Sequence, residues 1–165
     1  MTELKEMQWE TTYTLGYDPM DDIHDEFVEL LALLEEATDE QLPERLKQME
    51  DHLKSHFGEE DKWMEQTEFP PRECHMDEHA AVLASVAEVR VLLAEGDTEV
   101  CRSLTQALAE WFPGHTSHLD SALAHWMAKE KLKGKTMVFK PMKRIQKTSS
   151  NLNILLREYY GLIFP

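Results

Sequence analysis

The chain has 165 residues and a mass of 19.2 kDa, and 42% of its residues are hydrophobic, which is enough for one domain-sized core. Its 17 basic and 32 acidic residues give a net charge of −15, which argues against a nucleic-acid-binding surface over the body of the protein. Two cysteines without a CxxC motif, a polar N-terminus and the lack of a long apolar run predict a soluble cytoplasmic domain.

Apolar residues recur at three- and four-residue steps in four stretches, a pattern typical of helices. These stretches run from about 22 to 37, from about Pro43 to the break at Phe69-Pro70-Pro71, from about 72 to 94 and from about 98 to 128. Residues 1–19 are expected to form an irregular arm, and Pro113-Gly114 is expected to kink or interrupt the fourth helix. The predicted fold is all-α, an antiparallel up-down-up-down four-helix bundle.

The charge reverses abruptly near the end of the fourth stretch. From Lys129 onward, nine basic residues accompany two acidic ones, so this segment carries +7 and the first 128 residues carry −22. We therefore divide the chain into a bundle with its arm, 1–128, and a basic then apolar C-terminal extension, 129–165. The apolar run that ends the extension, NLNILLREYYGLIFP, is too short to span a membrane. We expect the extension to dock on a bundle, with a partly disordered appendage, a bound partner or contact with an anionic membrane surface as the alternatives.

Histidine recurs at core-facing positions on all four predicted helices. A single buried histidine is usually a neutral, hydrogen-bonded core residue, but coincidence on four helices is much less common. His56 and Glu60 are four residues apart, as are His75 and His79, so each pair lies on one helical face. The His/His pair can chelate one metal ion, and the His/Glu pair can offer an imidazole to one ion and a carboxylate that bridges to a second. His24 and His115 occupy the corresponding positions on the other two helices.

Asp120 follows His115 by five residues, which places the two about 140° apart on a regular α-helix. Long side chains or a locally distorted helix are needed to bring both to one site. Five imidazoles and two carboxylates inside an apolar bundle are costly to bury without cations. Imidazoles combined with bridging carboxylates favour a pair of iron ions, and they do not exclude other metals.

Several motifs together resemble the hemerythrin family, and more closely its bacterial single-domain branch, the bacteriohemerythrins. They are Trp9 and Gly16 ahead of MDDIH, then HFGEE, HMDEH after Pro70-Pro71, and WFPGHTSHLD. The resemblance implies a four-helix bundle whose non-haem di-iron centre binds O₂ reversibly, with seven metal ligands: His24, His56, Glu60, His75, His79, His115 and Asp120.

The resemblance also implies a role for each ligand. His75, His79 and His115 would bind a coordinatively saturated iron, and His24 and His56 would bind the iron that keeps an open position for O₂. Glu60 and Asp120 would bridge the two ions beside an oxo or hydroxo bridge. Residues at pocket-lining positions are Phe27, Phe57, Trp111, Phe112 and Thr116, the last two standing where the family often has leucine and isoleucine.

Other functions remain open from the sequence alone. Within the di-iron hypothesis, the alternatives to O₂ carriage or storage are an O₂, redox or iron sensor with the C-terminal extension as output, and an enzyme that reacts with peroxide or nitric oxide. We expect a binding protein rather than an enzyme. A ferritin-like oxidase is disfavoured because no histidine has Glu three residues before it, and a zinc protease because HEXXH is absent. His52, His118 and His125 are expected at the surface or at helix edges, not as ligands.

Overall fold

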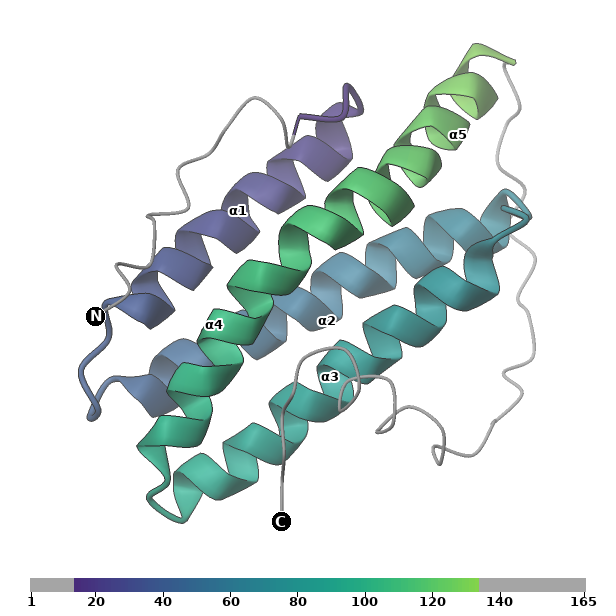
Figure 1. Cartoon of the computed structure of the whole chain (residues 1–165). Coiled ribbons are helices and arrows are strands. Elements are labelled where there is room, and N and C mark those ends of the chain that lie inside the picture. Colours follow the sequence, from purple (N-terminus) through teal and green to yellow (C-terminus); the bar gives the residue numbers. More distant parts are fainter. Residues whose placement is uncertain (1–13, 134–165) are drawn as a thin grey trace.

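The computed structural model describes residues 14–133, which form an antiparallel bundle of four helical rods (Figure 1). The fourth rod consists of α4, a π-helical turn η2 and α5 in succession. The all-α up-down-up-down bundle is therefore confirmed. The elements are α1 (Asp18–Glu35), α2 (Leu42–Gln66), α3 (Arg72–Ala94), α4 (Thr98–His115), η2 (Thr116–Asp120) and α5 (Ser121–Leu132).

Local chemistry fixes the helix ends. At the start of α1, the carboxylate of Asp21 accepts hydrogen bonds from the backbone N–H groups of Leu15 and Gly16, at 2.7 and 3.0 Å. Gly96 follows α3 with a φ of 102°, a left-handed conformation that glycine adopts without strain. Asp97 then caps α4 by accepting a hydrogen bond from the N–H of Val100 at 3.1 Å.

Some predicted boundaries need correction. The structure places Pro19 in the first turn of α1, where its fixed φ is favourable, so the helix begins four residues earlier than predicted and ends at Glu35. α2 ends at Gln66, before the Pro70-Pro71 break, and α5 continues to Leu132, into the segment assigned to the extension. The bounds of α3 match the prediction.

Pro113 lies inside α4 and does not interrupt it, so the predicted interruption is wrong, while the predicted kink stays a prediction. Pro113 has no N–H to offer the preceding turn, yet the helix continues to His115. The irregularity comes directly afterwards, in the π-helical turn η2, which holds one residue more than an α-helical turn.

The candidate ligands separate two clusters of buried apolar side chains. The larger cluster includes Phe27 and Leu46, and the smaller one consists of Met20, Trp63, Met64, Phe69, Leu123, Ala124 and Met127. On α1, His24 lies between Met20 and Phe27, one from each cluster. The bundle thus carries a polar layer across its core.

Two predicted segments lie outside the described residues: most of the N-terminal arm, 1–13, and the extension from 134 onward. At the inner end of the arm, the ring of Tyr17 packs edge-on against Trp63, with centroids 5.4 Å apart. None of the helices between residues 14 and 133 combines the length and the apolar composition needed to cross a membrane.

Candidate metal centre

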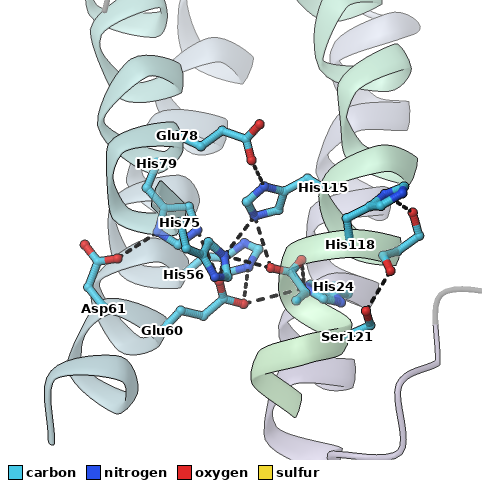
Figure 2. Close-up of polar contacts among 12 residues, drawn as sticks. His24, His56, Glu60, Asp61, His75, Glu78, His79, His115, His118 and Ser121 are labelled. Atoms are coloured by element: carbon cyan, nitrogen blue, oxygen red, sulfur yellow. Dashed lines mark hydrogen bonds and ion pairs between the residues drawn. The ribbon is translucent and has the colours of Figure 1, made fainter. Parts of the chain in front are cut away.

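The four rods bring all seven sequence-predicted ligands together in one buried layer (Figure 2). Each rod contributes at least one of them, and the most exposed, His115, is only 3% exposed. The contributions are His24 from α1, His56 and Glu60 from α2, His75 and His79 from α3, and His115 and Asp120 from the fourth rod.

Glu60 faces two different groups of imidazoles with its two carboxylate oxygens. Its Oε1 lies 3.1 Å from Nε2 of His56 and 3.7 Å from Nε2 of His24. Its Oε2 lies 3.2 Å from Nε2 of His79 and 3.5 Å from Nε2 of His75. A carboxylate in this position is arranged to bridge two cations.

Asp120 divides its oxygens in the same way. Its Oδ2 lies 3.2 Å from Nε2 of His24, whereas its Oδ1 lies 3.0 Å from Nε2 of both His75 and His115. The ring nitrogens therefore form a three-imidazole group and a two-imidazole group, with both carboxylates between them. We call the first (His75, His79, His115) the three-imidazole side and the second (His24, His56) the two-imidazole side.

The π-helical turn η2 brings His115 and Asp120 to the same face. In a π-helix, residues five apart lie one above the other, which an α-helix does not allow. The local distortion that the five-residue spacing demanded is therefore present in the structure, between the two residues that need it.

The electrostatics of the layer favour bound cations. Burial disfavours the charged form of Glu60 and Asp120, but the facing imidazoles outweigh it and hold the pKa of both well below the usual range. Burial likewise opposes protonation of His24 and His115. Asp120 and Glu60 nevertheless raise the pKa of His24 to about 9, and Asp120 with Glu78 raises that of His115 to about 10. Bound metal ions would supply the positive charge that the two buried carboxylates otherwise receive from protonated imidazoles.

Comparison with known proteins agrees with this arrangement. Residues 15–126 match the sequence model of the family described as "Hemerythrin HHE cation binding domain". The chain belongs to the hemerythrin family. It is 37% identical over 122 residues to a bacteriohemerythrin of Ralstonia nicotianae, covering 74% of this chain and 89% of that protein. A bacteriohemerythrin of Stenotrophomonas maltophilia is 27% identical over 120 residues, covering 70% and 78%. No solved structure matches the chain significantly.

The aromatic residues predicted to line the pocket divide between the two sides of this hemerythrin-family site. Phe112 packs edge-on against His24 at 5.3 Å between centroids and stacks on Phe27 at 4.2 Å, so these two rings cover the two-imidazole side. Phe57 stacks on His79 at 4.1 Å, and Trp111 lies 4.4 Å from His115, so these two cover mainly the three-imidazole side.

Thr116, the fifth predicted lining residue, is 1% exposed, and its hydroxyl has no hydrogen-bond partner in residues 14–133. It begins η2 and directly follows the ligand His115. A buried polar group without a partner is costly, which sets this position apart from an ordinary core threonine.

Sequence reasoning missed two residues of the hemerythrin-family centre. Asp61 on α2 accepts a hydrogen bond from Nδ1 of His79 at 2.8 Å, and Glu78 on α3 accepts one from Nδ1 of His115 at 2.5 Å (Figure 2). The only sequence signal was adjacency, because Asp61 follows Glu60 and Glu78 precedes His79.

The three remaining histidines are not ligands to the cluster. His118 and His125 are exposed, as predicted, and His118 points away from the layer (Figure 2). His52 is buried, which corrects the expected surface or helix-edge position. Its Nδ1 lies 3.1 Å from Oε2 of Glu26, and its ring packs against that of His56 with centroids 5.4 Å apart.

Proposed function

We propose that this hemerythrin-family chain holds two iron ions and binds O₂ reversibly, as a carrier, store or delivery protein. The observation that supports this most directly is the division of the donor atoms. Five donors surround the three-imidazole side: three imidazoles and one oxygen from each carboxylate. The two-imidazole side has four, two imidazoles and the other two oxygens. The side with fewer protein ligands is the one with room for O₂.

The mixture of imidazole and carboxylate donors suits iron. Two ferrous ions, when bound, supply the two electrons needed to hold O₂ and take them back on release. The protein's part is to set the geometry and to keep the pocket dry. Phe27 and Phe112 cover the two-imidazole side with apolar rings, which favours a small apolar ligand over water or an anion.

Metal analysis combined with optical spectra tests the proposal. The full chain is reduced anaerobically, its iron content is measured, and spectra are recorded before O₂ is added, after it, and after O₂ is removed again. We expect two irons per chain and a visible absorption band that appears with O₂ and disappears on its removal. The Asp77→Asn variant is a control, because Asp77 is exposed and has no polar contact in the described part of the chain.

Three other results would contradict the proposal in different ways. A chain that contains zinc and shows no spectral response to O₂ would contradict the proposed iron centre. Irreversible oxidation of the iron by the first addition of O₂ would contradict reversible O₂ binding. Repeated turnover of peroxide or nitric oxide, faster than with free iron, would favour the enzyme that the sequence left open. A cytoplasmic location, the 1–128 and 129–165 division and a sensory role for the extension stay predictions.

A further inference from the structure

Two carboxylates outside the ligand set accept hydrogen bonds from two of the ligand imidazoles, at the ring nitrogen that faces away from the bridging carboxylates. His79 and His115 each turn Nε2 toward the bridging carboxylates and donate from Nδ1 to a second carboxylate, Asp61 and Glu78 respectively (Figure 2). The Asp61 side chain is 30% exposed and that of Glu78 is 38% exposed. Each therefore lies at the boundary between the buried layer and solvent.

Both hydrogen bonds also connect neighbouring helices. Asp61 reaches from α2 to His79 on α3, and Glu78 reaches from α3 to His115 on α4. Each carboxylate sits next to a ligand in sequence, Asp61 beside Glu60 and Glu78 beside His79. The same helical turns that present ligands therefore also orient ligands on the next helix.

This support is unequal between the two sides. Two of the three imidazoles on the three-imidazole side, His79 and His115, have a carboxylate at Nδ1. On the two-imidazole side, Nδ1 of His24 and Nδ1 of His56 are buried and have no hydrogen-bond partner within residues 14–133. A carboxylate at the far nitrogen fixes the tautomer, orients the ring and makes the metal-facing nitrogen a stronger donor. Loss of such a partner typically lowers metal affinity by about 10- to 100-fold.

We propose that Asp61 and Glu78 are positioning residues that make the three-imidazole side the higher-affinity metal position, so that the two ions load in order, this side first. The inference rests on the proposed two-metal centre and adds to it a difference in affinity and the residues that set it. The extra imidazole contributes to the difference, and the two carboxylates enlarge it by holding His79 and His115 in place before metal arrives.

An anaerobic titration of the metal-free full chain with Co²⁺, followed by its visible absorption, tests the loading order. We expect two separate binding steps. Asp61→Ala or Glu78→Ala should weaken the first step by about 10- to 100-fold and leave the second within about twofold. Asp77→Ala is the matched control, since it removes an exposed acidic residue from the same turn of α3 without touching an imidazole, and it should change neither step.

A second readout separates positioning from general destabilisation. In the Co²⁺-loaded chain, the exchangeable Nδ1 protons of bound imidazoles are resolved individually by ¹H NMR. Asp61→Ala should move the signal of His79 and leave the others in place. Asp61→Asn keeps an oxygen acceptor at the same point and should restore most of the first-step affinity. Circular dichroism of each variant checks that the bundle is folded.

The possible outcomes distinguish this inference from the proposed function. Two steps of equal affinity, or a second step that falls as much as the first in both variants, would overturn the loading order and leave a two-metal centre standing. Unchanged affinities in Asp61→Ala and Glu78→Ala would overturn the positioning role. A chain that takes up one ion or none would contradict the proposed function itself.

Discussion

Oδ1 of Asp120 lies 3.0 Å from Nε2 of His115, although the two residues are five positions apart along the chain. On a regular α-helix they would point about 140° apart. The π-helical turn η2 closes this gap with one additional residue, and Asp120 then reaches both sides of the ligand layer. Such turns are rare and often mark functional sites, and here the turn is a condition for the seventh ligand.

Insertion of one alanine after Ser117 is expected to remove Asp120 from the ligand layer. η2 already holds one residue more than an α-helical turn, so a second extra residue rotates everything after it by about 100°. Ser117 is exposed, so the insertion point lies outside the core. Leu123 and Met127 then leave the smaller apolar cluster. Metal analysis should show fewer than two ions per chain, and urea denaturation should show a loss of at least about 2 kcal/mol in unfolding free energy.

Ser117→Ala is the control for this insertion, because it keeps the residue count. It should retain both ions and nearly all of the stability. An insertion variant that holds two ions and unfolds like the parent would show that the spacing of His115 and Asp120 across η2 is not needed for the site.

Thr116→Val is expected to stabilise the metal-free chain. The Thr116 hydroxyl is buried without a hydrogen-bond partner in the described residues, so an apolar group of the same shape should raise the unfolding free energy by about 1 kcal/mol. Thr105→Val is the matched control, since the Thr105 hydroxyl is also buried but donates to the carbonyl of Cys101 at 2.9 Å. This control should lose about 1 kcal/mol. Urea denaturation of both variants should show a gain in unfolding free energy for Thr116→Val and a loss for Thr105→Val. Equal changes in the two variants would contradict the conclusion that the Thr116 hydroxyl has no hydrogen-bond partner.

His52→Gln is expected to preserve two metal ions per chain. Burial, reinforced by the neighbouring His56, lowers the pKa of His52 to about 4, so a neutral imidazole hydrogen-bonds Glu26. The substitution should cost about 1 kcal/mol of stability through that bond. His56→Gln should instead lose the ion on the two-imidazole side. Metal analysis of the two variants separates these roles, and equal losses of metal would identify His52 as a ligand.

The two cysteines are expected to differ sharply in reactivity. Cys74 is exposed on α3, whereas Cys101 is 0% exposed on α4, and burial raises the pKa of its thiol to about 11. The thiolate is the reactive form, so Cys101 should stay inert at pH 8 until the chain unfolds. Labelling with a thiol reagent should therefore modify one cysteine in the native chain and none in Cys74→Ser. Two rapidly modified thiols would contradict the buried position of Cys101.

Much of the fold could be predicted because hydrophobic spacing and helix ends are local signals. α3 has the predicted bounds, since Pro70-Pro71 precedes it and Gly96 follows it. Pro19 and Pro113 were misjudged for one reason: proline disfavours helix interiors in general, but the first turn accepts it and a long packed helix can absorb it. The ligand positions were visible because histidines at core-facing positions are conspicuous in an apolar pattern.

The supporting residues were hidden because their partners lie on other helices. Asp61 and Glu78 bond histidines 18 and 37 residues away, and in sequence each resembles a solvated acidic residue on a helix face. His52 was misplaced for a similar reason, since its burial depends on the packing of α1 against α2. The five-residue spacing of His115 and Asp120 indicated that long side chains or a distorted helix were needed, but it did not predict a π-helical turn.

The polar layer divides the apolar core into two clusters, which weakens the coupling between their unfolding. The smaller cluster, at the end where α2 meets α3, contributes little hydrophobic contact to the larger one because the ligands stand between them. The candidate ligands come from all four rods, so bound metal is expected to hold the rods together at that level. Without metal, the end built on Leu123 and Met127 can open while the end built on Leu46 stays closed, so amide hydrogen exchange at the two ends should diverge when metal is removed and converge when it is restored. We therefore expect bound metal to determine whether the bundle unfolds as one unit or as two.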